Sequence, residues 1–244
     1  MRRRPGIHLE NTSAHTTLRW GNIVEDVDDP SGEMVIVSTP SARAYEWDVS
    51  LLNRTVAEDN PEYPPTDWVV VCVYRDELDA EFPYYDGHRP LSLRKLSRES
   101  NVNMYSFPES RVRVVGRVKP PKVPIDEIHP SPYHARTFSV DDNREFIETT
   151  RKEGRPLGLP MVREVEDGFE TINGHKRIWV SERAGLEEIP VQVLDIDDRR
   201  AADLWAKHHY DRYTEQQQEA ALNRLVDRFG ITVFDKLHHL SPPA

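Results

Sequence analysis

The segment that most restricts the fold of this chain is a strand, a tight Asn-Gly turn and a helix within residues 169–186. Gly174 allows the sharp turn and a close backbone approach. The start of the following helix offers unpaired N–H groups and a partial positive charge. His175, Lys176 and Arg177 lie in that first turn, where cations do not stabilise the helix itself. These residues therefore predict an anion or phosphate site, and the alternative is a solvated basic start of a helix.

Prolines at positions 120, 121 and 124 mark a joint in the chain. We expect an N-terminal α+β segment over residues 1–118, a second α/β domain over 119–230, and a short tail over 231–244. In the first segment the patterns predict three strands and one helix: Met34–Ser38, Asp67–Tyr74, Arg111–Val118 and helix Leu91–Glu99. In the second they predict a hairpin, one further strand and four helices: Leu159–Ile172, Ile189–Leu194, Asp141–Glu153, His175–Ala184, Asp197–His209 and Thr214–Phe229.

The run Trp68–Tyr74 is apolar throughout and rich in β-branched residues. Such a run is typical of a central strand that is buried on both faces. It contains Cys72, the only cysteine, which we expect in the core. A single cysteine excludes an internal disulfide and any zinc site that needs two thiolates from one chain.

The overall charge is acidic, with 42 Asp and Glu against 32 Lys and Arg and a net charge of −10. This balance argues against a uniformly basic nucleic-acid coat but not against local patches. The abundance of Asp and Arg and the scarcity of Lys fit a salt-adapted or high-GC source. No apolar stretch is long enough to span a membrane, and no apolar core follows the basic N-terminus. We therefore expect a soluble, cytoplasmic protein without a membrane partner.

A local basic stretch lies within residues 89–122, where nine cations against two carboxylates give +7. Regular strand geometry would place Arg111, Arg113 and Arg117 on one face. One interpretation is a surface for the DNA backbone; the other is a surface paired with the acids of residues 76–86. The candidate DNA-binding residues are Arg94, Lys95, Arg98, Arg111, Arg113 and Arg117.

Two histidine pairs, at 208–209 and 238–239, raise the question of a metal site. Neighbouring residues on a helix point about 100° apart, so such a pair is a poor chelate. We therefore expect no metal site and a polar helix surface.

From Val118 to Gly230 the order of motifs resembles the ParB N-terminal domain of the ParB/sulfiredoxin superfamily. The resemblance rests on three segments, Val123–Arg136, Asn173–Arg177 and Ala184–Val191, in that order. ParB proteins are DNA-segregation clamps that bind and hydrolyse CTP. The resemblance thus implies a ParB/sulfiredoxin-like fold, a bound nucleoside triphosphate with CTP favoured, and a role in plasmid, viral or chromosome maintenance or in regulation. The partners that it implies are DNA, a partition ATPase and a second copy in a homodimer.

Three family motifs build the nucleotide site. The first ends in an arginine and is similar to His134-Ala135-Arg136, and the second is a phosphate box similar to Gly174-His175-Lys176-Arg177. The third, Glu-Asn-x-x-Arg, falls on residues 208–212. The resemblance therefore implies six nucleotide-binding residues: Arg136, Gly174, His175, Lys176, Arg177 and Arg212.

The third motif keeps only Arg212, because His208 and His209 replace its carboxylate and amide. Mg²⁺ prefers oxygen ligands, so this departure argues against Mg²⁺-dependent hydrolysis unless Asp211 substitutes for the missing carboxylate. Nucleotide binding needs only the cations and the helix start. Whether the protein is a nucleoside triphosphatase stays open, and no catalytic residue is assigned.

Other branches of the superfamily fit less well. Sulfiredoxin chemistry needs a cysteine in the phosphate box, where this chain has His175. The serine-kinase relatives use a glutamate after the first strand, whereas residues 128–136 carry no carboxylate. Two alternatives stay open: a nuclease or kinase-like phosphotransferase that uses the same pocket, and a non-catalytic interaction module.

The 14 residues after Gly230 are too few for a helix-turn-helix module, so we expect any DNA specificity to come from the N-terminal segment or a partner.

Overall fold

The computed structural model describes residues 17–49, 53–235 and 237. It divides into two compact units, Met1–Lys119 and Pro120–Ala244, each with both helices and strands. The mixed α/β class expected from the sequence is confirmed. In the described ranges, no helix combines the length and the apolar composition needed to cross a membrane.

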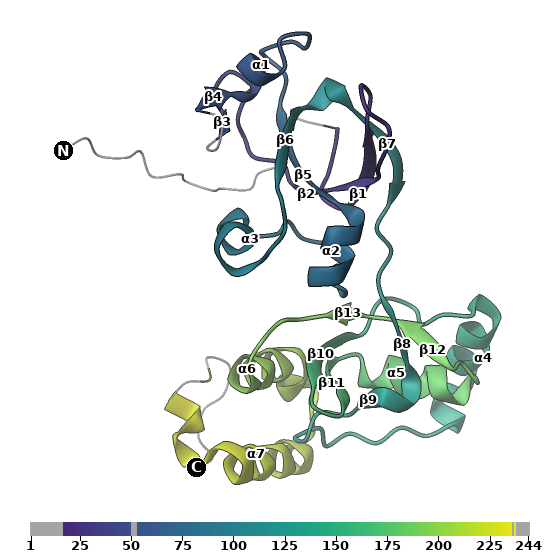
Figure 1. Ribbon diagram of the computed structural model, residues 1–244. Coiled ribbons are helices and arrows are strands. Elements are labelled where there is room, and N and C mark those ends of the chain that lie inside the picture. Colours follow the sequence, from purple (N-terminus) through teal and green to yellow (C-terminus); the bar gives the residue numbers. More distant parts are fainter. Residues whose placement is uncertain (1–16, 50–52, 236, 238–244) are drawn as a thin grey trace. The chain divides into compact units, whose positions relative to one another are not determined.

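The first unit is built on a five-stranded antiparallel sheet with the order β6-β5-β2-β1-β7 (Figure 1). Its strands are β1 (Asn22–Asp26), β2 (Met34–Ser38), β5 (Val69–Tyr74), β6 (Tyr105–Pro108) and β7 (Val112–Arg117). The remaining elements are the pair β3 (Asp48–Val49) and β4 (Arg54–Thr55), helices α1 (Val56–Asp59), α2 (Arg75–Glu81) and α3 (Leu93–Glu99), and the 3₁₀ turn η1 (Glu109–Arg111).

Strand β5 is central and buried, as its apolar run predicts. Its alternate residues enter two separate cores, because successive side chains of a strand point to opposite faces. Val69, Val71 and Val73 pack with buried residues of all three helices, whereas Val70 and Cys72 pack with β1 and β2 on the other face. Cys72 is a free, fully buried thiol, and burial raises its pKa. The prediction of a core cysteine is confirmed.

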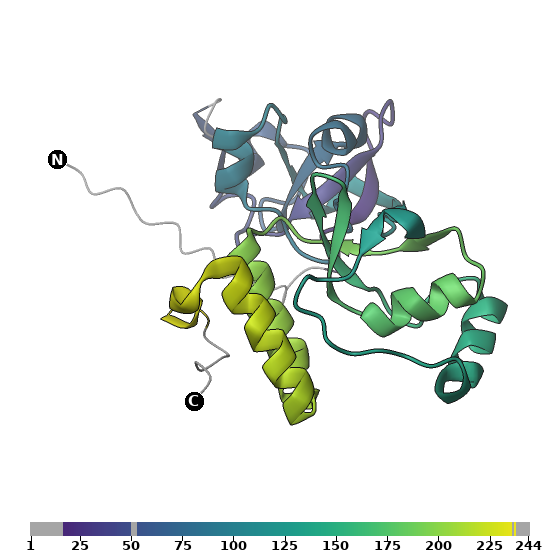
Figure 2. The ribbon, with the colours of Figure 1, turned by 90° about the horizontal axis from the view of Figure 1, so that it is seen from below.

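Within its described residues, the second unit combines two small sheets with four helices (Figure 2). One sheet pairs β8 (Lys122–Pro124) with β12 (Glu188–Pro190), and the other has the order β13 (Gln192–Val193), β10 (Met161–Val165), β11 (Gly168–Asn173) and β9 (Ile128–His129). The helices are α4 (Arg144–Glu153), α5 (His175–Arg183), α6 (Asp198–His209) and α7 (Glu215–Phe229). The 3₁₀ turns are η2 (Ile125–Glu127), η3 (Asp141–Asn143), η4 (Tyr210–Arg212) and η5 (Ile231–Asp235).

Helices α6 and α7 enclose the main core of this unit. Trp205 of α6 is fully buried and its ring centre lies 4.8 Å from that of Tyr133. Leu225 of α7 joins the same cluster, as do Phe234 and Leu237 beyond the helix. The loop that carries Tyr133 is therefore anchored to both C-terminal helices.

One predicted strand, Ile189–Leu194, is wrong. The chain forms two short strands there, and Val191 lies between them. β12 pairs antiparallel with β8, whereas β13 pairs parallel with β10, so the chain passes from one sheet to the other. Pro190 has no N–H to donate and is the last residue of β12.

Candidate functional site

The turn between β11 and α5 forms as predicted. Gly174 caps the helix at φ 103°, in the left-handed region. A Cβ at this position would lie 3.0 Å from the Cα and Cβ of Pro160, so the turn needs glycine both for its φ and for its space. The first residue of the helix is then His175, whose side chain is buried.

Three imidazole rings from separate segments meet at this turn. His134, from the loop after β9, stacks on His175 with 3.7 Å between ring centres and 2° between planes. His209, in the last turn of α6, lies edge-on to His175 at 5.2 Å. The expectation of a polar surface for the pair at 208–209 is therefore wrong for His209, because the last turn of α6 faces the core. The pair at 238–239 lies outside the described residues.

One nitrogen of each ring is held by the surrounding chain. The Ser131 amide donates to Nε2 of His175 at 3.2 Å, and Nδ1 of His134 lies 2.7 Å from the Tyr213 hydroxyl. Nε2 of His209 lies 3.2 Å from the carbonyl oxygen of Ile172. These contacts fix the rings in place from three directions.

The environment keeps the rings neutral. Burial lowers the pKa of His134 to about 4 and, together with the neighbouring His134 ring, that of His209 to about 4. Burial, with the His134 and His209 rings, also holds the pKa of His175 well below its usual range. Neutral rings can stack closely, whereas two imidazolium ions would repel each other.

A cleft of about 630 Å³ opens beside these rings. It carries two cations, Arg136 and Arg224, and two aromatic rings, Phe138 and Trp179, whose centres lie 5.7 Å apart. The Arg224 guanidinium donates to the carbonyl oxygen of His134. The size and the mixture of apolar surface with a few polar groups are typical of small-molecule sites.

The cleft wall contains polar atoms without partners. His134 Nε2, His175 Nδ1 and Ser131 Oγ are buried and make no hydrogen bond within the described part of the chain. All three residues line the cleft. Buried polar atoms are nearly always satisfied, so such a group points to a water or a ligand at this wall.

The loop that carries Arg136 also contacts η4, which ends at Arg212. Nη2 of Arg136 donates to the carbonyl oxygen of Arg212 at 2.8 Å, and its guanidinium lies 5.6 Å from the centre of the Tyr213 ring. The structure thus brings together residues of all three sequence motifs, His134 and Arg136, Gly174 and His175, and His209 and Arg212.

Lys176 and Arg177 are engaged elsewhere. Lys176 lines a separate hollow of about 320 Å³, with its Nζ 5.6 Å from the centre of the Phe146 ring. Nη1 of Arg177 donates to the carbonyl oxygen of Leu159 at 2.7 Å, and burial lowers its pKa. Neither residue lines the cleft of Arg136 and His175.

The comparison with known families decides what this domain is. The family model described as the ParB N-terminal domain matches residues 110–206. This chain carries a ParB N-terminal domain. The resemblance inferred from the motifs is confirmed. The match begins within η1 and stops inside α6, so that His209 and Arg212 lie beyond it.

Curated relatives agree with this assignment. The chain is 32% identical over 116 residues to the chromosome-partitioning protein ParB of Myxococcus xanthus, covering 46% of this chain and 38% of that protein. It is 32% identical over 114 residues to a probable chromosome-partitioning protein ParB of Xylella fastidiosa, covering 44% and 36%. The chain therefore spans less than half the length of these relatives.

Among solved structures, the chain is similar to the C-terminally truncated ParB of Caulobacter crescentus complexed to the centromeric parS site. The TM-score is 0.34 at 21% identity, covering 45% of this chain and 58% of that chain. Because this score is low, the family match rests on sequence.

The donor atoms near the three central histidines decide whether a metal ion fits this domain. In residues 17–49, 53–235 and 237, no group of three or more His, Cys, Asp and Glu is arranged to hold a metal ion. The three central histidines stack against one another, and each uses one ring nitrogen for a protein contact. This donor set does not fit Mg²⁺, which prefers oxygen ligands.

Several cleft residues were missed by sequence reasoning. Arg224 lies on α7, outside all three motifs, and no local pattern separates it from other surface arginines of a helix. Trp179 packs against the Val180 cluster and also lines the cleft with Phe138, and its apolar side chain gives no sequence signal for that second role. The tertiary arrangement alone identifies this group.

The basic residues of the first unit fall into two groups. Arg94, Lys95 and Arg98 are exposed on α3, whose buried Leu96 faces the core. Arg111 instead chelates Asp26 through two nitrogens, at 3.0 and 2.7 Å, and also donates to Asn60 at 2.6 Å.

The expectation that the three later arginines share one face is wrong. Arg111 lies in η1, before the strand begins. The pairing register of β7 shifts between Ile23 and Val24 of β1. Arg113 therefore lies opposite Glu25 and Arg117 opposite Asn22, and these partners are three residues apart on β1. Residues three apart point to opposite faces of a strand, so Arg113 and Arg117 do as well. Arg113 pairs with Glu25 of β1, not with the acids of residues 76–86.

Proposed function

We propose that this protein is a ParB-like, DNA-associated protein that binds a nucleoside triphosphate, CTP in the first place, in the cleft beside α5. The observation that carries the proposal is that the three motif segments meet, with His134 stacked on His175 and Arg136 bonded to the Arg212 carbonyl, beside a cleft that residues of the first two segments line. We further propose a role in plasmid, viral or chromosome maintenance or in regulation, in the cytoplasm and as a homodimer with an ATPase partner, and the similarity to ParB proteins supports this role.

The chemistry of the cleft supports a nucleotide. The guanidinium groups of Arg136 and Arg224 suit charge-assisted hydrogen bonds to phosphate oxygens. The rings of Phe138 and Trp179 offer flat apolar surface for a base. The unpartnered atoms of Ser131, His134 and His175 provide polar groups that ribose or base edges can satisfy.

The second motif contributes less charge than the sequence predicts. Gly174 and His175 form the cleft-side turn, whereas the contacts of Lys176 and Arg177 lead away from the cleft. We therefore assign phosphate binding to Arg136 and Arg224, with Arg212 beside them, and expect Lys176 and Arg177 to contribute only after a change of rotamer.

The donor set supports binding without Mg²⁺-dependent turnover. The third motif supplies His208 and His209 where the ParB family has a carboxylate and an amide. The affinity of the protein for CTP should therefore be nearly the same with and without Mg²⁺. Any remaining effect of Mg²⁺ should come from the ion that CTP itself binds.

Isothermal titration of the full chain with CTP, ATP and GTP, each with and without Mg²⁺, tests this function. We expect saturable heat with CTP. Arg136→Ala and Arg224→Ala should each lower the affinity for CTP about tenfold, as for the loss of one charge-assisted hydrogen bond. Arg155→Ala, an exposed arginine outside the cleft, is the matched control. Absence of heat with all three nucleotides would assign the chain to the non-catalytic interaction modules.

A further inference from the structure

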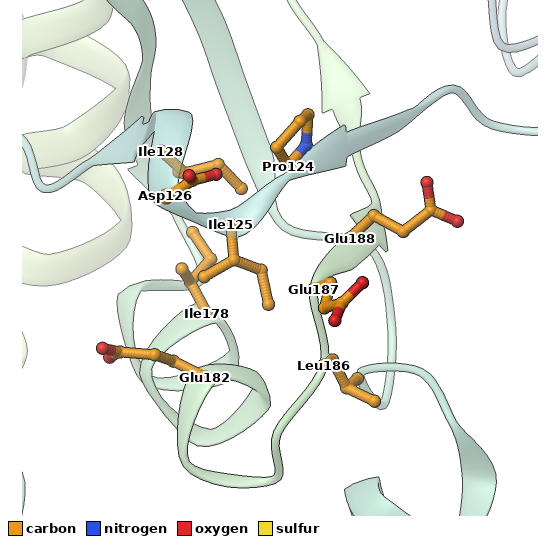
Figure 3. Close-up of a pocket in the computed structure, with 9 residues that line it drawn as sticks. All are labelled: Pro124, Ile125, Asp126, Ile128, Ile178, Glu182, Leu186, Glu187 and Glu188. Carbon is orange, nitrogen blue, oxygen red and sulfur yellow. The ribbon is translucent and has the colours of Figure 1, made fainter.

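A second groove adjoins the proposed nucleotide cleft along α5 and Ile128. It has a volume of about 840 Å³ and is lined by η2, the second half of α5 and the loop that enters β12 (Figure 3). Its floor is aliphatic, formed by Ile125, Ile178 and Leu186. It shares Ile128, Ile178 and Glu182 with the nucleotide cleft, but the two have different charge.

The rim of this groove is uniformly acidic. Its four charged lining residues are all carboxylates: Asp126, Glu182, Glu187 and Glu188. Figure 3 shows Glu187 and Glu188 on the opposite side of Ile125 from Glu182. The aliphatic floor therefore runs between two sets of negative charge.

Most of this charge is not compensated. Glu188 pairs with Lys122 at 2.5 Å. Asp126, Glu182 and Glu187 are exposed and form no ion pair with any residue that the structure describes. A rim with about three free negative charges around an apolar floor is complementary to a cationic ligand that carries an apolar centre.

We propose that this groove docks a short basic segment of a partner protein, with one aliphatic side chain on the floor and lysine or arginine residues on both sides of it. The aliphatic anchor covers Ile125 and Ile178, and the flanking cations reach Glu182 on one side and Glu187 on the other. The proposal goes beyond nucleotide binding and does not depend on it.

Binding of a defined peptide to the nucleotide-free full chain tests the proposal. The probe is a fluorescein-labelled peptide Gly-Lys-Arg-Leu-Arg-Lys-Gly, and its matched partner has Gly in place of Leu. We expect saturable anisotropy that weakens with added salt and is lower for the Gly peptide, because both charge and the apolar anchor contribute. Equal binding of the two peptides would overturn the role of the apolar floor.

The deciding variant is Asp126→Asn with Glu187→Gln, since neither residue lines the nucleotide cleft. We expect a loss of affinity of about fivefold, as for two exposed ion pairs. The control is Glu166→Gln with Glu219→Gln, which removes the same charge at exposed positions outside the groove. An equal loss in both variants would show non-specific attraction to an acidic protein and would overturn the proposal.

Three further measurements locate the peptide and exclude other occupants. Amide shifts on peptide addition should map to residues 125–128 and 182–188, and shifts confined to other regions would contradict the proposal. A dimer in sedimentation that Asp126→Asn with Glu187→Gln dissociates would assign the groove to a second copy of the chain. Tighter peptide binding after deletion of residues 1–16, which include Arg2, Arg3 and Arg4, would assign it to the protein's own N-terminus. Either result overturns the proposal.

Discussion

His134 stacks on His175 with parallel rings 3.7 Å apart, and this contact joins the first and second ParB motifs. Burial lowers the pKa of both imidazoles, so both rings are neutral near pH 7. The stack thus connects the shape of the proposed nucleotide cleft to the protonation of its histidines.

The first prediction is a loss of stability in mild acid. An unfolded histidine titrates near pH 6.5, whereas the pKa of His134 and that of His209 are about 4 in the folded chain. Between these values the unfolded state binds more protons, so the contribution is complete above pH 6.5 and is lost as the pH falls towards 4. We expect on the order of 2 kcal/mol per ring.

Urea unfolding at pH 7 and at pH 4.8 checks this prediction. Asp26 and Asp198, whose pKa is lowered, lose their contribution below their ordinary value of 3.8, and Glu58 loses its contribution below 4.5, so all three lie outside this window. His134→Gln with His209→Gln should flatten the dependence. An unchanged dependence in that variant would show that other groups dominate.

The second prediction compares two glycines at the ends of α5. Gly174 and Gly185 both have positive φ, at 103° and 81°. A Cβ on Gly185 meets nothing within 4 Å, whereas one on Gly174 lies 3.0 Å from Pro160. Gly185→Ala should therefore cost about 1 kcal/mol from backbone strain alone, and Gly174→Ala about 2–3 kcal/mol.

Nucleotide titration separates the two effects further. Gly174→Ala moves the turn that presents His175 to the cleft and should weaken CTP binding, whereas Gly185→Ala should leave it unchanged. Equal losses of stability and affinity in both variants would contradict the role of the Pro160 contact.

The local elements could be predicted from the sequence wherever one strong signal was sufficient. The apolar run at 69–74 and the turn at Gly174 form as expected, and the third motif begins in the predicted last turn of α6. The switch of sheets at Val191 could not be predicted, because an apolar run gives no information about which strand it pairs with. Arg224 was missed for the same reason, since its place in the cleft depends on how α7 packs.

The basic stretch shows the limit of counting charges. Its +7 sum includes Arg111, which is held by Asp26 and Asn60, and Arg113, which is paired with Glu25. A sequence window cannot see these partners, because they lie more than 50 residues away along the chain.

The third prediction concerns the buried ion pair of the second unit. Arg163 of β10 donates to Glu170 of β11 at 2.8 Å, with the two side chains 5% and 7% exposed. Arg163 also pairs with Asp198, which in turn pairs with Arg228 of α7. Glu170→Gln removes a buried partner charge and should cost about 3 kcal/mol in urea unfolding.

Two controls define the cause. Glu148→Gln breaks the exposed pair with Arg151 and should cost about 0.5 kcal/mol or less. Adding Arg163→Met to Glu170→Gln should restore part of the loss, because it removes the buried Arg163 charge, which keeps only Asp198 as a partner once Glu170 is neutral. Equal destabilisation by Glu148→Gln and Glu170→Gln would contradict this account of burial.

The last prediction separates DNA contacts from internal pairing in the first unit. Arg94, Lys95 and Arg98 are exposed on α3, so their joint substitution by Gln should weaken binding to two duplexes of unrelated sequence to the same extent. The slope of log affinity against log salt should fall by about 3 if each contacts one phosphate. The control removes three exposed cations of the second unit: Lys152→Gln, Arg155→Gln and Lys207→Gln.

Arg111→Ala should instead lower the free energy of unfolding, because it leaves Asp26 and Asn60 without their shared partner. Retention of the full salt slope in the α3 variant would exclude this helix as the DNA surface.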